Sequence, residues 1–90
     1  MFSKNAKKFV LDITITRLKM LTKMDNPVSN EQFTDSVQYT LISGVSKKEM
    51  ARKLRVSIST INRWNNGSSC PHPFGRKPAI MAMHEILLRK

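Results

Sequence analysis

The fold of this chain is decided by residues 46–67, SKKEMARKLRVSISTINRWNNG. Ser46 and Glu49 have the spacing of a capping box, in which a hydroxyl and a carboxylate each accept a hydrogen bond from a backbone N–H at the start of a helix. Apolar residues then recur with helical spacing on both sides of a very short polar interruption. The stretch therefore predicts two short helices, at about 47–54 and 58–65, joined by a tight turn.

The apolar positions of this stretch predict how the two helices pack. Ala51 is small enough for a second helix to cross close over it, and Ile61 and Trp64 lie three residues apart on one helical face. We expect Trp64 to be a core anchor, because its spacing from Ile61 is that of a buried stripe. Ser57 is expected to cap the second helix. The residues left pointing away from the core are Ile58, Ser59, Thr60, Asn62 and Arg63.

The same stretch resembles the helix-turn-helix of the Cro and phage-repressor family, often called Xre-like, a family of prokaryotic, phage and plasmid regulators. The positions that carry the resemblance are Lys47, Ala51, Arg55, Val56, Ser57, Ile61, Trp64 and the closing Asn66-Gly67. Two of them depart from the family pattern, since Arg55 stands at the usual glycine of the turn and Lys47 at the usual glutamine. Arg55 is therefore expected to adopt a left-handed or nearby backbone conformation, at some energetic cost.

The resemblance implies that the second motif helix enters the major groove of double-stranded DNA. The exposed residues of this helix suit the major groove. Short polar groups can bond to base edges, an apolar residue can pack on a thymine methyl, and the arginine guanidinium can bond to guanine O6 and N7. The base-reading candidates are Ser57, Ile58, Ser59, Thr60, Asn62 and Arg63. By motif position, the resemblance implies phosphate contacts from Ser46, Lys47 and Asn66. Charge alone adds four further phosphate candidates, which are Lys53, Arg55, Arg76 and Lys77.

The distribution of charge singles out the same half of the chain. The 90 residues hold 16 Lys and Arg against 6 Asp and Glu, which gives a net charge of +10. Residues 1–43 contribute six basic and four acidic side chains (+2), whereas residues 44–90 contribute ten and two (+8). A basic surface alone is often only a solvated face. Here the excess coincides with the motif, as contact with a polyanion requires.

The sequence contains no recognisable pattern for a metal site, a cofactor site or a catalytic site. Cys70 is the single cysteine, so it cannot form an intrachain disulfide, and a reducing compartment suits it. Cys70, His72 and His84 do not have the spacing of a structural zinc site and lack a fourth ligand. They also form no evident nucleophile–base pair, since the only nearby orienting acid is Glu85. We therefore expect no metal, no cofactor and no enzymatic activity.

No stretch of the sequence has the composition of a membrane span or a signal peptide. None approaches about 18 uninterrupted apolar residues. Asp12, Arg17 and Lys19 interrupt the apolar part of the N-terminal segment, and no small-residue cleavage site follows it. The expected location is the cytoplasm, in association with the nucleoid.

Residues 9–24 show strand and helix periodicity at once. Leu11, Ile13 and Ile15 alternate with polar residues, as in a strand, but a helical face can also be drawn through the segment. We favour a short strand at 10–16. A lone strand needs a partner, such as the same strand of a second subunit, so residues 1–28 are expected to form an N-terminal dimerisation arm. Half-sites for such a homodimer would lie about one helical turn, roughly 34 Å, apart on a near-palindromic operator.

Two further helices are expected around the motif. Ser29 and Gln32 have the spacing of another capping box, which opens a helix at about 30–43. A last helix is expected over 77–90, with Pro78 tolerated in its first turn. The core-facing positions expected in these two helices are Phe33, Val37, Leu41, Ile80, Met83 and Leu87.

Together these patterns predict one all-α domain of about four helices, with a short N-terminal strand that pairs across a dimer. The expected function is sequence-specific binding of double-stranded DNA in transcription regulation, with RNA polymerase or another protein as a further partner. One alternative is an antitoxin-like or adaptor protein whose N-terminal segment binds a partner protein. Another is a non-specific binder of nucleic acid or anionic membrane, driven by charge alone.

Overall fold

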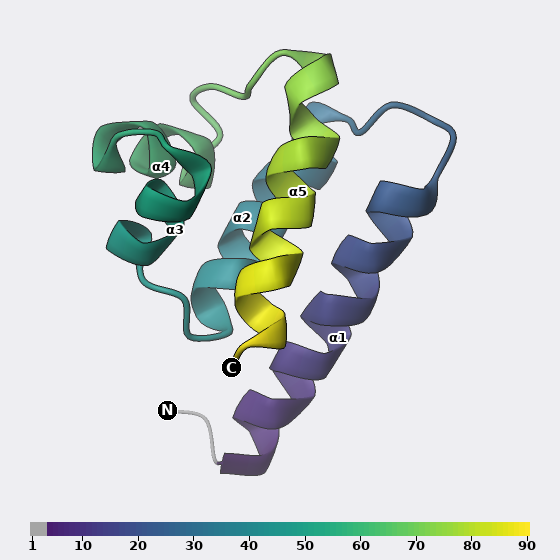
Figure 1. Cartoon of the computed structure of the whole chain (residues 1–90), viewed down its shortest axis with the longest axis vertical. Coiled ribbons are helices and arrows are strands. Elements are labelled where there is room, and N and C mark those ends of the chain that lie inside the picture. The colour runs from purple at the N-terminus through teal and green to yellow at the C-terminus, as the bar shows by residue number, and fades with distance from the viewer. Residues whose placement is uncertain (1–3) are drawn as a thin grey trace.

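The N-terminal segment is helical. A computed structural model describes the chain from Lys4 to Lys90, with side chains from Lys8 onward. Residues Lys4–Lys23 form helix α1 (Figure 1). The strand expected at 10–16 is therefore wrong, and with it the dimer built on strand pairing; Met1–Ser3 of the expected arm lie outside the described residues.

The helical periodicity prevails in α1 because it buries one continuous stripe. The stripe consists of Leu11, Thr14, Ile15, Leu18 and Leu21, spaced by three and four residues. Ile13, which completes the alternating pattern, is 47% exposed instead. The buried hydroxyl of Thr14 donates to the Val10 carbonyl oxygen at 2.8 Å, so a β-branched polar residue is satisfied inside the helix.

Helix α2 spans Asn30–Ile42 and begins at the predicted capping box. The Ser29 hydroxyl accepts a hydrogen bond from the Gln32 N–H at 3.1 Å, and Gln32 Oε1 accepts one from the Ser29 N–H at 2.9 Å. Both backbone groups are thereby satisfied at the helix start. The helix ends before Gly44, whose φ of +108° lies in the region that favours glycine.

The two motif helices form where the sequence predicts them, as α3 (Lys47–Leu54) and α4 (Ile58–Asn65). Only half of the capping box predicted for α3 is present. The Ser46 hydroxyl accepts from the Glu49 N–H at 3.0 Å, whereas the Glu49 carboxylate pairs with Lys90 Nζ at 3.0 Å. The C-terminus of the chain is thus tied to the start of the motif.

Helix α5 spans Pro73–Leu88 and begins four residues earlier than predicted. Pro73 occupies the first helical position, where its missing N–H costs nothing. His72 Nδ1 caps the helix by accepting from the Phe74 N–H at 3.3 Å. Pro78 was expected to mark the first turn, but it lies further inside and is exposed. The Phe74 carbonyl that it leaves unbonded can therefore be solvated.

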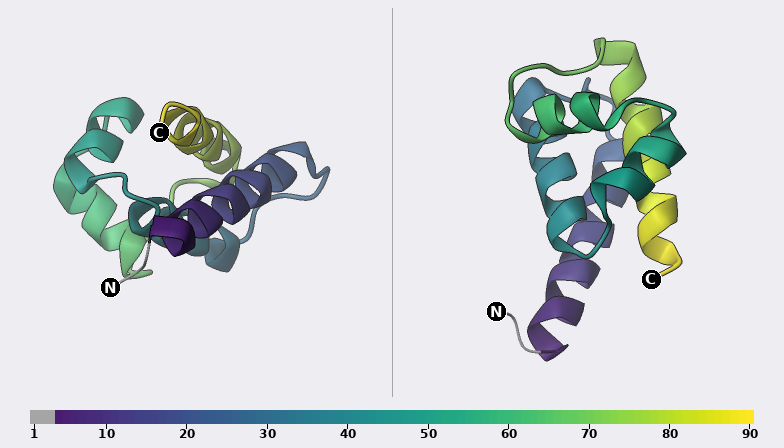
Figure 2. Two further views of the ribbon diagram at one scale, coloured as in Figure 1. Left: turned by 90° about the horizontal axis from the view of Figure 1, so that it is seen from below. Right: turned by 90° about the vertical axis from the view of Figure 1, so that its left-hand side faces the viewer.

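Five helices surround one core in the described chain, which confirms an all-α fold (Figures 1 and 2). Helix α1 packs chiefly against α5, while α2 contacts α1, α4 and α5. Helices α3 and α4 lie on the side of the molecule opposite to α1 (Figure 1). Five of the six core positions expected in α2 and α5 are fully buried, and Leu41 packs against the core from a partly buried position. The fully buried apolar side chains include Leu18, Phe33, Val37, Met50, Ile61, Ile80 and Met83.

Candidate nucleic-acid interface

The turn between α3 and α4 is closed by backbone hydrogen bonds alone. The Val56 N–H donates to the Ala51 carbonyl at 3.0 Å, and the Arg55 N–H donates to the Arg52 carbonyl at 3.3 Å. This pair of bonds is a Schellman motif, and it requires a left-handed residue at Arg55. Arg55 has φ 59° and ψ 43°, which confirms the left-handed conformation expected for it from the sequence. The turn is tight because α3 stops abruptly at this residue.

We expect Arg55→Gly to stabilise the domain, because a residue with a Cβ is strained in the left-handed region. The free energy of unfolding should rise by about 0.5–1 kcal/mol, part of the relief being offset by the larger entropy of an unfolded glycine. Urea unfolding followed by circular dichroism measures the difference. Arg52→Gly, inside α3, is the matched control and should lower stability by about 1 kcal/mol. Equal effects of the two substitutions would contradict strain at Arg55.

Helix α4 begins at a cap that also involves its own first turn. The Ser57 hydroxyl accepts from the Thr60 N–H at 3.0 Å and lies 2.9 Å from the Thr60 hydroxyl. Arg63 Nη2 donates to that Thr60 hydroxyl at 3.4 Å. Ser57 and Thr60, both base-reading candidates, are therefore occupied in fixing the helix start and in orienting Arg63.

One side of α4 is anchored in the core. Ile61 is fully buried and Trp64 is 8% exposed, as predicted for a core anchor. The Trp64 and Phe33 rings meet edge to face, with centroids 5.2 Å apart. Gln38 Nε2, from α2, donates to the Asn65 carbonyl at 2.8 Å. This bond satisfies one of the carbonyl groups that the last turn of α4 leaves without a partner within the helix. These contacts fix the rotation of α4 about its axis and therefore which residues face outward.

The opposite side of α4 is open. Ile58 is 47% exposed, and Ser59, Asn62 and Arg63 are exposed as well. They fall on one helical face, with Ile58 and Ser59 at its leading end. Asn66 extends this face, but its Oδ1 accepts from the Ser68 N–H at 2.9 Å and its amide thus also closes the following loop. Four of the six base-reading candidates (Ile58, Ser59, Asn62 and Arg63) therefore lie together on this exposed face, and none of them packs in the core.

Five of the seven phosphate candidates divide into two groups. Ser46, Lys47 and Arg55 are exposed at the start of α3 and at the turn, next to the motif. Arg76 instead donates to the carbonyls of Val28 at 2.8 Å and Pro71 at 3.0 Å. Lys77 Nζ donates to the carbonyl at residue 24. The structure does not bring Arg76 and Lys77 to the motif, because they hold the α1–α2 connection against α5.

Lys53 is engaged in an ion pair across two helices. Its Nζ lies 2.9 Å from the Glu85 carboxylate of α5. The hydrogen bond and the charge of Lys53 together lower the pKa of Glu85 below its usual value. Glu49 is likewise paired with Lys90. Both acidic residues of the second half of the chain are therefore matched by a lysine, and its remaining positive charge is uncompensated within that half.

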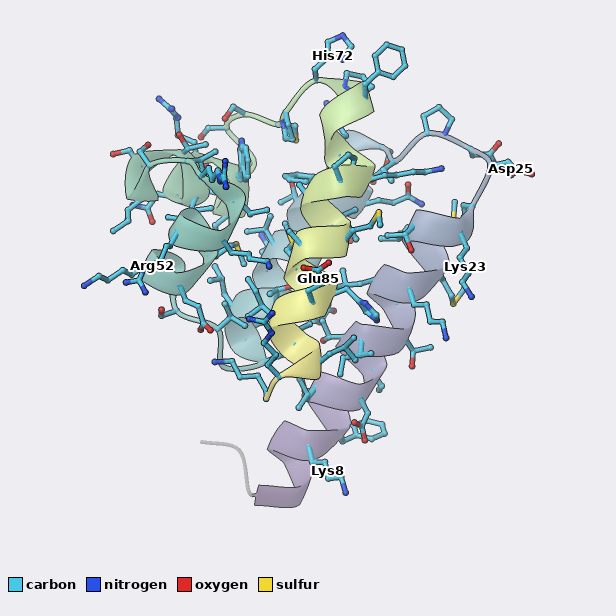
Figure 3. The ribbon with its side chains drawn as sticks, in the orientation of Figure 1. Lys8, Lys23, Asp25, Arg52, His72 and Glu85 are labelled. Carbon is cyan, nitrogen blue, oxygen red and sulfur yellow. The ribbon has the colours of Figure 1, made fainter. Side chains whose placement is uncertain are left out.

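The structure also reveals two basic residues that sequence reasoning missed, Arg52 and Arg89. Together with the phosphate candidate Arg55, they line a groove between α3 and the end of α5. Arg52 projects outward from α3, on the side of the molecule away from α1 (Figure 3). Arg52 could have been included on its position in the motif. Arg89 could not, because only the packing of α5 on α3 brings it to this groove.

Comparison with known proteins yields no relatives: no family model, no curated protein and no solved structure matches the chain. Within Lys4–Lys90, none of the helices is both long and apolar enough to cross a membrane. No three potential metal-ligating side chains gather in that same range.

Proposed function

We propose that this protein binds double-stranded DNA in a sequence-specific manner and regulates transcription from the cytoplasm, on the nucleoid. The observation that carries the proposal is the two-sided character of α4. Its inner face is locked by Ile61 and Trp64, while its outer face presents Ile58, Ser59, Asn62 and Arg63. A rigid helix that offers amide, hydroxyl, guanidinium and methyl groups at its leading end suits a major groove.

The surroundings of α4 support contact with phosphates. The N-termini of α3 and α4 carry unsatisfied backbone N–H groups and the positive end of a helix dipole. Lys47 and Arg55 are exposed beside them. No acidic residue occurs between Met50 and His84. Glu49, in the first turn of α3, is paired with Lys90. A duplex that approaches this side therefore meets an excess of positive charge.

Selection from a random pool of duplexes, followed by competition, tests the proposal. A specific regulator should enrich one short consensus and keep that fragment bound in a large excess of random duplex. A charge-driven binder should yield no consensus and lose the fragment to competitor in proportion to its mass. Failure to enrich any consensus would overturn specific recognition.

A second candidate is an adaptor or antitoxin-like protein that binds a partner protein through its N-terminal segment. The observation in its favour is the outer face of α1, where Phe9 is 65%, Ile13 47% and Met20 61% exposed. Isolation of the chain in a stoichiometric complex through this face, without any selected consensus, would favour this function over DNA binding.

A further inference from the structure

The outer face of α1 is an apolar stripe with no cover in the described chain. Phe9, Ile13, Thr16 and Met20 are all exposed and follow one another at intervals of four, three and four residues. These intervals place them on one line along the helix, on the side opposite to Leu18 and the buried stripe. Such spacing is that of a seam between two packed helices.

We propose that this stripe is covered by the same stripe of a second copy, with the two α1 helices antiparallel. In an antiparallel pair related by a two-fold axis, residue i of one helix faces residue j of the other, and the sum of i and j is the same for every facing pair. If that sum is 29, Phe9 faces the partner's Met20 and Ile13 faces the partner's Thr16. Every member of the stripe then has a counterpart, and a large side chain meets a smaller or more flexible one in each layer.

The charges beside the stripe agree with this register. Asp12 and Lys19 lie on the same flank of α1, almost two helical turns apart. In an antiparallel pair the same flanks of the two helices adjoin, so Asp12 comes close to the partner's Lys19, and the pair occurs twice. On the other flank, Arg17 lies 3.9 Å from Asp35 and over the Tyr39 ring, so its charge is balanced within its own chain. The second copy thus pairs the charges of one flank, and those of the other flank are already paired within each chain.

The proposed dimer is weak and orients the two motifs outward. A single helix pair lies at the small end of specific interfaces, below about 1,200 Å² of buried surface. Because α1 lies opposite α3 and α4 (Figure 1), and Lys8 and Lys23 mark its outer edge (Figure 3), the two α4 helices fall on the far sides of the dimer. We therefore expect half-sites more than one helical turn apart, in place of the adjacent spacing expected from sequence. The pairing of the α1 helices involves no residue of the DNA-binding face, so the dimer should form whether or not the protein binds DNA.

Sedimentation equilibrium over a wide range of protein concentration tests the pairing. The unmodified chain should show a reversible monomer–dimer equilibrium. Ile13→Glu should weaken it by more than about a hundredfold, because two carboxylates would be buried in the seam. Met81→Glu is the matched control, since Met81 is 55% exposed on α5 and outside the stripe; it should leave the equilibrium unchanged. A chain that is monomeric at every concentration, or equal loss in both variants, would overturn the proposal.

Charge exchange tests the register. Asp12→Lys sets lysine against lysine at both pairs, and Lys19→Asp sets aspartate against aspartate, so each variant alone should dimerise about tenfold more weakly. Mixing the two variants restores both attractive pairs and should yield a heterodimer at least as tight as the original dimer. A mixture no tighter than its components would refute the antiparallel register. Circular dichroism of each variant establishes that α1 remains folded.

Discussion

Trp64→Ala should lower the free energy of unfolding by about 3–5 kcal/mol. The indole is 8% exposed, meets Phe33 edge to face at 5.2 Å and ties α4 to α2. A domain of this length has roughly 5–13 kcal/mol of stability in total, so the variant should be partly unfolded at physiological temperature. The free energy of unfolding is measured by urea unfolding followed by circular dichroism, because the variant no longer has a tryptophan whose fluorescence could be followed.

Two further variants separate packing from DNA contact. Ile58→Ala removes an apolar side chain from the exposed face of the same helix and should change stability by less than about 0.5 kcal/mol. Trp64→Phe keeps an aromatic ring and should recover much of the loss. If Trp64→Ala left the unfolding midpoint unchanged and reduced only DNA affinity, Trp64 would be a base-stacking residue and the anchoring of α4 would be misassigned.

The motif could be predicted from sequence because its determinants are local. The cap at Ser57 is set by the Thr60 N–H three residues away. The left-handed conformation of Arg55 was expected from the glycine of the family that the motif resembles, and it is held by backbone hydrogen bonds to Arg52 and Ala51. Trp64 was placed in the core from its spacing to Ile61 alone. Each of these interactions spans at most five residues, so the pattern of residue types contains the information.

Tertiary contacts decided the features that were missed. The sequence ITIT at residues 13–16 fits a strand and a helix almost equally, and only the packing of α1 against α5 and α2 selects the helix. Arg76 was a phosphate candidate on charge, yet it donates to the Val28 carbonyl 48 residues away. A positive charge in the sequence does not reveal whether its partner is a phosphate or the backbone of another loop.

Asn62→Ala and Arg63→Ala should each reduce the ability of the protein to distinguish its consensus duplex from other sequences, while leaving the fold intact. Both side chains are exposed on α4, so stability should change by less than about 0.5 kcal/mol. A lost bidentate base contact costs about 1–3 kcal/mol of discrimination, or roughly 5- to 150-fold. The measurement is the ratio of affinities for the selected consensus and for its single-base variants.

Lys47→Ala is the control for this prediction, because Lys47 lies at the start of α3 rather than on the exposed face of α4. It should weaken all duplexes by a similar factor and reduce the slope of log affinity against log salt by about 0.9. The two kinds of variant thus differ in what they change: a ratio between sequences, or a common factor with its salt dependence. If Asn62→Ala and Arg63→Ala behaved like Lys47→Ala, the outer face of α4 would contact only the phosphate backbone, and base recognition would have to come from another element.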